Sequence, residues 1–336
     1  PQEKIEELNK IERQTRNLNP TRTQPLCDQI KQLCEQAPFD QKLYQLGLAH
    51  VLVIETYLNI RDLQLEVAME KAFRSQEILE HLQKPAWLPK VYNNFGLIYR
   101  LQGLSQDALV VFEKQLDLSR QLGDKDQEAT ALHDMSLAAD SSNAAMAKLE
   151  EALAIYTEAQ IQDGIVFTLM NMSGTLLQQG EFVAARELAL EGLELANQHE
   201  LYSLESFLLQ RLAFACRRLE MLDEAERYYK KSIESAKKIG LAQQVVEGLL
   251  LLGDFYLQYG RLEESRLLLE EAEQIVEMGS SSEFRLWVNE LLAEYWKAAN
   301  DVAQTLKYTE LCLQLQKKKS KIALTRHASH FDKLRQ

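Results

Sequence analysis

The sequence has no proline after Pro89, although six prolines occur before or at that position. Because proline breaks the interior of helices, a long stretch without it is compatible with continuous helices. That stretch is rich in Leu, Ala, Glu and Gln, which are good helix formers. No segment alternates polar and apolar residues with the period of two that half-buried strands show. The sequence therefore predicts an all-α protein.

Other absences narrow the class of function. No apolar run approaches the ~20 residues of a membrane-spanning helix, and the start of the chain, PQEKIEELNKIERQ, lacks the apolar segment of a signal peptide. The net charge of −12 argues against non-specific nucleic-acid binding, which needs clustered Lys and Arg. Four scattered cysteines are too few for a disulfide framework. We therefore expect a cytoplasmic protein with reduced cysteines, without membrane insertion and without nucleic-acid binding by this region. The cysteines are Cys27, Cys34, Cys216 and Cys312.

A small residue recurs along the chain with a period near 40 residues. Gly96 and Gly253 both lie in the local pattern Gly-x-x-Tyr-x-x-x-Gly, and small residues occupy the equivalent positions between and after them. Glycine inside a helix costs about 1 kcal/mol against alanine, so its use here needs a packing reason. A fixed period of this length is typical of a solenoid. The six marker residues are Gly96, Ser136, Ser173, Ala213, Gly253 and Ala293, with steps of 40, 37, 40, 40 and 40.

A second set of small residues follows the markers, and a large residue such as Phe112 stands four positions later in four of the six units. We interpret each unit as two antiparallel helices. The marker on the first helix lets the second helix approach, and the large residue fills the gap. We assign the single 37-residue step to a turn between Ser136 and Ala145 that is three residues shorter than its counterparts. The second set is Ala108, Ala145, Ala185, Ala225, Ser265 and Thr305.

This pattern resembles the tetratricopeptide repeat (TPR) family. The period near 40 is similar to that of kinesin light chains, LGN-type polarity proteins and bacterial signalling proteins. The resemblance implies a right-handed superhelix, an α-solenoid of about six or seven helical hairpins with capping helices at both ends. It is carried by Tyr92, Phe95, Gly96, Tyr99, Ala108 and Phe112, whereas Gln115 departs from the last small position of the family pattern.

We expect three regions in the chain. Residues 1–37 would form N-terminal capping helices, residues 38–318 the TPR array, and residues 319–336 a C-terminal capping or connector helix. Both ends would be explained if the sequence were part of a longer protein, and removal of an initiator Met would explain a start at proline. The repeats are expected near residues 42–83, 89–123, 129–158, 166–199, 206–239, 246–279 and 286–318.

No sequence motif indicates catalysis, a cofactor or a metal site. The phosphate-binding loop, the dinucleotide fingerprint, the zincin helix and the nucleophile elbow are all missing. His133 and Asp134 are neighbours on a predicted helix, so their side chains should point about 100° apart and not form a dyad. His327 and His330 share a helical face but have no third ligand nearby. We therefore expect a non-catalytic protein without cofactor or metal.

The resemblance also implies a ligand site. In TPR proteins the first helices line a concave groove, and an Asn two residues before the marker holds the backbone of a bound peptide. The equivalent residues here are Asn94, Asp134, Asn171 and Arg211, followed by Leu251 and Leu291. The arginine cluster of the fifth repeat, Arg211, Arg217 and Arg218, either binds a ligand carboxylate bidentately or bridges acidic side chains on neighbouring helices. The groove candidates are Asn93, Asn94, Arg100, His133, Asp134, Asn171, Gln210, Arg211, Arg217, Arg218, Asp254 and Gln258.

The leading hypothesis is a scaffold that binds a protein or peptide segment in the concave groove without catalysis. The amides of Asn94 and Asn171, together with the arginines, would supply the contacts. Two alternatives stay open. The chain could be the sensor or regulatory region of a larger bacterial signalling protein, such as a nucleotide cyclase or a transcription regulator. It could also be a peptide-pheromone receptor similar to the bacterial quorum-sensing TPR proteins.

Overall fold

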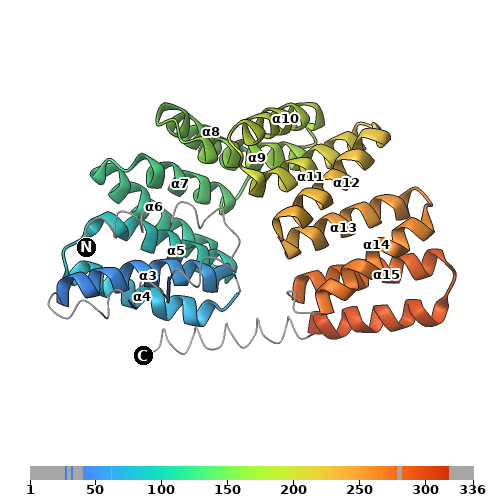
Figure 1. Ribbon diagram of the computed structural model, residues 1–336, viewed down its shortest axis with the longest axis horizontal. Coiled ribbons are helices and arrows are strands. Elements are labelled where there is room, and N and C mark those ends of the chain that lie inside the picture. The colour runs from blue at the N-terminus through green and yellow to red at the C-terminus, as the bar shows by residue number, and fades with distance from the viewer. Residues whose placement is uncertain (1–26, 29–31, 33–40, 62, 278–281, 318–336) are drawn as a thin grey trace. The chain divides into compact units, whose positions relative to one another are not determined.

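The computed structural model describes residues 27, 28 and 32 and the ranges 41–61, 63–277 and 282–317. Within these ranges the regular structure consists of helices, which confirms the predicted all-α fold. The helices follow one another as antiparallel pairs joined by short turns (Figure 1). Most of the predicted N-terminal cap, the predicted C-terminal helix and the pair of histidines at 327 and 330 lie outside the described residues.

The chain divides into two compact units, Pro1–Ala215 and Cys216–Gln336, with the boundary inside α11 (Tyr202–Arg218). The first unit contains α3 (Gln41–Arg61), α4 (Leu65–His81), the short 3-10 helix η1 (Pro85–Trp87), α5 (Leu88–Leu101), α6 (Ser105–Leu122), α7 (Lys125–Leu137), α8 (Ser142–Glu158), α9 (Gln162–Gln179) and α10 (Phe182–Gln198). The second contains α12 (Leu222–Ile239), α13 (Ala242–Gln258), α14 (Leu262–Glu277), α15 (Ser282–Ala298) and a helix over residues 302–317.

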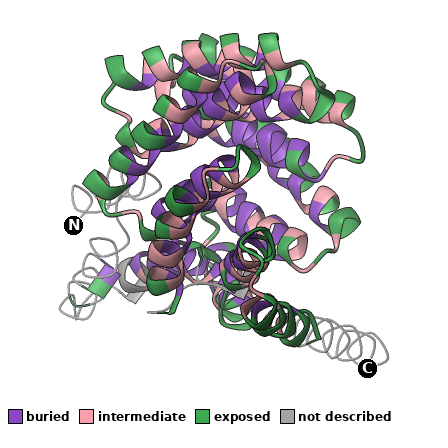
Figure 2. Ribbon diagram, turned by 90° about the vertical axis from the view of Figure 1, so that its right-hand side faces the viewer, coloured by how far each residue is buried: buried purple, intermediate pink, exposed green. Residues whose placement is uncertain are grey.

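Within each unit the helices pack as stacked hairpins. In the first unit, α3 packs on α4, α5 on α6, α7 on α8 and α9 on α10. The first helices of successive pairs also touch, since α5 contacts both α3 and α7, and α7 contacts α9. In the second unit α13 contacts α14 and α15. Figure 2 shows the buried residues concentrated where helices face one another. This nearest-neighbour packing is that of a solenoid.

The marker glycines have the packing role that the spacing predicts. A Cβ atom added to Gly96 would lie 2.5 Å from Cδ1 of the buried Phe112 ring. In the second unit, a Cβ on Gly253 would lie 2.9 Å from Cδ2 of Leu269. In both hairpins the large residue of the second helix therefore occupies the space that a side chain on the first helix would need.

One hairpin departs from the common register. The helices α7, α9, α11, α13 and α15 all begin eleven residues before their markers, but α7 ends one residue after Ser136, whereas the others end five or six residues after theirs. The prediction of a shorter turn is therefore wrong, because the helix α7 is shortened and the turn after it is not. The connection 138–141 is one residue longer than the connection 219–221 between α11 and α12. The shortening removes the last helical turn of α7 and leaves space beside α9.

Two further expectations concern the class of protein. Among the described residues, no helix has the length and apolar character that crossing a membrane requires. The described cysteines, Cys27, Cys216 and Cys312, are buried and lie outside any disulfide. The fourth, Cys34, lies outside the described residues.

Candidate ligand-binding site

The first helices of the first unit are joined by hydrogen bonds between polar side chains. Asn93 on α5 donates through Nδ2 to the Oδ2 carboxylate oxygen of Asp134 on α7. Its neighbour Asn94 donates through Nδ2 to the main-chain oxygen of Val53 on α3 at 2.9 Å. Both asparagines are buried. Their amides thus bond inside the protein and hold successive first helices together.

The same bonding continues from α7 to α9. Nδ1 of His133 lies 3.4 Å from Oδ1 of Asp134, so the two adjacent side chains do meet, contrary to the sequence-based expectation. Nδ2 of Asn171 lies 2.9 Å from Nε2 of His133. An amide nitrogen only donates, so Nε2 accepts and the ring proton sits on Nδ1, facing Asp134. We call the connected series Asn93, Asp134, His133 and Asn171 the polar ladder.

Gln115 on α6 belongs to the same network, and the sequence analysis missed its role. Its Oε1 accepts from Nδ2 of Asn93 at 3.4 Å, and its Nε2 donates to the main-chain and side-chain oxygens of Gln127, each at 3.4 Å. Gln115 is completely buried. A signal was present, because a glutamine stands where the repeat pattern has a small residue.

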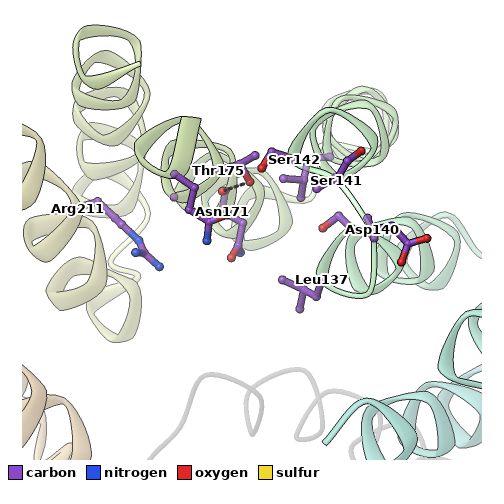
Figure 3. Close-up of a pocket in the computed structure, with 13 residues that line it drawn as sticks. Leu137, Asp140, Ser141, Ser142, Asn171, Thr175 and Arg211 are labelled. Atoms are coloured by element: carbon purple, nitrogen blue, oxygen red, sulfur yellow. Dashed lines mark hydrogen bonds between the residues drawn. The ribbon is translucent and has the colours of Figure 1, made fainter. Parts of the chain in front are cut away.

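A pocket of about 370 Å³ lies where α7 lacks its last turn. It brings together two of the predicted residues, Asn171 on α9 and Arg211 on α11, with residues of the α7–α8 connection that the sequence analysis did not select. The 37-residue step in the repeat period could have pointed to the residues of the α7–α8 connection, but the sequence analysis attributed that step to a shorter turn. Figure 3 labels Leu137, Asp140, Ser141, Ser142, Asn171, Thr175 and Arg211 among the lining residues.

Asn171 can offer only one kind of hydrogen bond to a ligand. Its Nδ2 bonds to Nε2 of His133 and donates to the main-chain oxygen of Phe167 at 2.8 Å, which uses both amide hydrogens. Its Oδ1 is then the side-chain atom left to accept a bond. The Phe167 ring packs against His133 in a tilted arrangement, with centroids 4.5 Å apart and an interplanar angle of 37°, and the Phe167 side chain is 38% exposed.

Arg211 approaches the backbone of α9 at Gly174. A Cβ atom added to Gly174 would lie 3.3 Å from Cζ and 3.4 Å from Nε of Arg211. The missing side chain thus lets a half-buried guanidinium group lie against α9 and line the pocket. In Figure 3 the carboxylate of Asp140, on the opposite side of the pocket, points away from Arg211.

In the second unit, Arg217 and Asp254 form an ion pair. Nη1 of Arg217 lies 2.9 Å from Oδ2 of Asp254 on α13, and Arg217 also donates to Oε1 of Gln258. Burial lowers the pKa of Arg217, but the hydrogen bond and charge of Asp254 outweigh it and raise the pKa. For Arg217, the interpretation in which arginine bridges an acidic residue on a neighbouring helix is confirmed.

The remaining predicted residues belong neither to the polar ladder and its pocket nor to the Arg217–Asp254 ion pair. Nε of Arg100, in the last turn of α5, and Nε2 of the buried Gln210 on α11 are buried atoms without a hydrogen-bond partner. Arg218 is exposed at the end of α11. Across the described ranges, no group of His, Cys, Asp and Glu is arranged to hold a metal ion.

A separate charge network lies at Glu226 on α12 in the second unit. Its carboxylate accepts from Nη1 of Arg261 at 2.5 Å, from Nζ of Lys230 at 2.6 Å and from the Tyr256 hydroxyl at 2.8 Å. The hydrogen bond from Arg261 is the main cause that lowers the pKa of Glu226 to about 2, against the opposing effect of burial. The network connects α12, α13 and the start of α14.

The Glu226→Gln variant should be less stable than the wild type at pH 7 by about 1 kcal/mol. This loss of stability is smaller than the lowered pKa of Glu226 implies, because the Glu226 carboxylate is partly solvated. The carboxylate's contribution is present above its ordinary pKa near 4.5 and is lost as the pH falls from there towards 2. Urea titrations at pH 7, 4.5 and 3 should therefore show the gap shrinking. Glu224→Gln, which removes a 4.0 Å pair with Arg227, should stay near the wild type throughout. A gap independent of pH would contradict the assignment.

Comparisons with known proteins agree with this architecture. Residues 203–278 and 89–126 match models described as tetratricopeptide repeat. No curated protein matches the sequence. Together with the stacked hairpins and the marker packing, the two matches show that the chain contains tetratricopeptide repeats.

Three solved structures share the fold. A Rap protein complexed with Competence and Sporulation Factor has a TM-score of 0.66 at 16% identity, covering 99% of this chain and 92% of its own. A signal transduction ATPase (STAND) with a tetratricopeptide repeat sensor from Pyrococcus horikoshii has a TM-score of 0.59 at 12% sequence identity. The match covers 86% of this chain and 45% of the ATPase chain. NprR in complex with its cognate peptide NprX has a TM-score of 0.58 at 16% sequence identity. The match covers 80% of this chain and 76% of the NprR chain. At these identities the likeness concerns the fold.

Proposed function

We propose that this chain is a non-catalytic TPR protein that binds a protein or peptide segment along its first helices, in the cytoplasm. The observation that carries the proposal is the pocket beside α9. It combines a cationic donor, Arg211, with a hydrogen-bond acceptor, Oδ1 of Asn171, in a cavity of about 370 Å³. Concave sites with a few convergent polar groups are the usual form of ligand sites. The complex of NprR with its peptide is an example of ligand binding on a similar fold.

The contacts of His133 favour binding over catalysis. A general base needs a free ring nitrogen within reach of a substrate proton. Here Nε2 is occupied by Asn171 and Nδ1 faces Asp134. The nearby Ser136 hydroxyl donates to the main-chain oxygen of His133, not to its ring. The pair therefore serves the polar ladder and the orientation of Asn171.

A second candidate is a sensor region within a larger signalling protein, including a peptide-pheromone receptor. It is favoured by the STAND ATPase, in which a repeat sensor is one part of a longer chain and this chain covers 45% of the length. The same pocket would then bind the signal. Expression of the full open reading frame, with and without a bound peptide, would test whether a second activity responds.

The test of binding uses the Asn171→Ala/Arg211→Ala double variant. Peptides selected from a phage-displayed random dodecapeptide library with the wild type are titrated by fluorescence anisotropy. Removing a charged donor and a neutral acceptor should weaken binding by at least about tenfold, given ~1.5–3 and ~0.5–1.5 kcal/mol for such bonds. Helicity should stay almost unchanged, but the melting temperature should fall by a few degrees, because the buried Nε2 of His133 loses its hydrogen-bond partner.

The matched control is Lys148→Ala on α8, which removes one charge from an exposed pair with Glu151 in the same unit. It should bind the selected peptides as the wild type does. If every selected peptide bound the double variant and the wild type equally well, the pocket would not be the binding site.

A further inference from the structure

We propose that His133 is a pH-sensitive switch that decides which hydrogen bond Asn171 offers to a ligand in the pocket beside α9. While the His133 ring is neutral, Asn171 offers the acceptor Oδ1. When the ring takes up a second proton, the Asn171 amide turns over and offers its NH2 group instead. A ligand that donates to Asn171 is then released on acidification. This regulation rests on the proposed function, because it requires a ligand in that pocket.

The neutral ring of His133 has a defined tautomer in the polar ladder. Its Nε2 lies 2.9 Å from Nδ2 of Asn171 and accepts, so the ring proton sits on Nδ1, 3.4 Å from Oδ1 of Asp134. The His133 side chain is buried, which keeps water from replacing these partners. The orientation of the Asn171 amide therefore depends on the protonation state of one ring nitrogen.

A second proton on the ring is incompatible with the present orientation of the Asn171 amide. Both nitrogens of an imidazolium are donors, so the new Nε2–H would point at the N–H of Asn171. A half-turn of the amide about χ2 brings Oδ1 to Nε2 and carries Nδ2 to the former place of Oδ1. The turn gives up the bond from Nδ2 to the main-chain oxygen of Phe167. A bond with a charged donor is about twice as strong as this neutral one, so the turned amide is favoured.

The charges around His133 suit an imidazolium. Asp134 faces Nδ1 with one carboxylate oxygen and is held by Asn93 through the other, so a buried cation would have a fixed counter-ion. The helices α5, α6, α8 and α9 pack against α7. Within the described ranges, no charged side chain of these four helices bonds to the ring, whose polar partners are Asp134 and Asn171. Histidine is also the side chain that ordinarily changes its charge between pH 5 and 8.

The turned amide changes what the pocket recognises. A ligand N–H that bonds to Oδ1 of Asn171 at neutral pH would meet an NH2 group after the turn and lose its acceptor. One neutral hydrogen bond corresponds to a factor of about 2–12 in affinity. We therefore expect the affinity for such ligands to fall about fivefold between pH 7.5 and 5.5, with the uptake of one proton.

The first experiment follows the ring and the amide in the chain without ligand. Nuclear magnetic resonance of the 15N-labelled chain is recorded from pH 8 to 5, with His133→Gln and Asn171→Ala spectra to assign the two side chains. The ring of His133 should start with its proton on Nδ1 and become doubly protonated, and the NH2 signals of Asn171 should shift with the same midpoint. His199→Gln, which removes an exposed histidine after α10, should leave both titrations unchanged. A ring that stays neutral, an amide that does not follow it, or a loss of helicity in step with the ring would overturn the switch.

The second experiment measures the affinity of the phage-selected peptides at pH 7.5 and 5.5 by fluorescence anisotropy. Peptides with capped termini and without His, Asp or Glu are used, so that the peptide itself does not titrate. The wild type and His199→Gln should lose about fivefold in affinity at the lower pH. His133→Gln should show no such change, because its side-chain oxygen accepts from Asn171 at both pH values.

Two results would count against the regulation of binding. If His133→Gln lost as much affinity on acidification as the wild type, another group would cause the pH dependence. If the ring and the amide titrated together while the wild type bound equally at both pH values, Asn171 would not contact the ligand. Failure of every peptide to bind at either pH would instead remove the proposed function, and the regulation with it.

Discussion

The Gly96→Ala variant is expected to lose about 3 kcal/mol of unfolding free energy from the first unit. A methyl group at this position would lie 2.5 Å from Cδ1 of Phe112, so α5 and α6 would have to separate. The gain of about 1 kcal/mol in helix propensity is too small to offset this. Urea unfolding can be followed through Trp87, which packs in the same core cluster as Phe95, with the second unit's tryptophans replaced by phenylalanine.

Two controls separate the clash from a general effect of alanine. Gly174→Ala should not destabilise the first unit, since its Cβ would meet only the guanidinium of Arg211, at 3.3 Å from Cζ. Adding Phe112→Leu to Gly96→Ala should restore part of the loss, so that the double variant is more stable than the sum of the two single changes predicts. Simple additivity of Gly96→Ala and Phe112→Leu would show that the ring is not the obstacle.

The Asp134→Leu variant should cost the first unit a similar amount, about 3 kcal/mol. Asp134 accepts from Asn93 through one carboxylate oxygen and faces Nδ1 of His133 with the other. Both partners are buried. Leaving a buried donor without an acceptor costs ~1–3 kcal/mol each. The same urea titration reports the loss, and the affinity of selected peptides should also fall, because His133 no longer fixes the Asn171 amide.

A double-mutant cycle with Asn93→Leu tests this explanation. When both partners become apolar, the penalty of an unpaired buried group is partly removed. The Asn93→Leu/Asp134→Leu variant should therefore lose less stability than the two single variants together, by about 1 kcal/mol or more. Losses that add exactly would mean that the Asn93–Asp134 bond does not contribute to the fold.

The sequence predicted the hairpin packing because that packing is local. Gly96 and Phe112 lie on consecutive helices, and the same small–large spacing recurs at Gly253 and Leu269. A marker that recurs in six successive units identifies the contact without knowledge of distant parts of the chain. For the same reason the all-α fold could be predicted from composition and periodicity.

The candidate site was predicted only in part. Asn171 and Arg211 were identified from their place two residues before the marker, and both line the pocket. The pocket itself could not be predicted, because a count of residues cannot decide whether a shortened repeat loses a turn or the end of a helix. The sequence also could not show that the Asn94 amide donates to the main-chain oxygen of Val53.

The repeating contacts between consecutive helices, and with them the hairpins and the tetratricopeptide-repeat class, were determined by the sequence itself. The tertiary structure alone decided which polar side chains bond to one another and which line the pocket beside α9. Those bonds join residues 41 and 38 positions apart on different hairpins, as between Asn93 and Asp134 or His133 and Asn171. Their existence depends on side-chain rotamers and on where α7 ends, and neither is encoded in a local pattern.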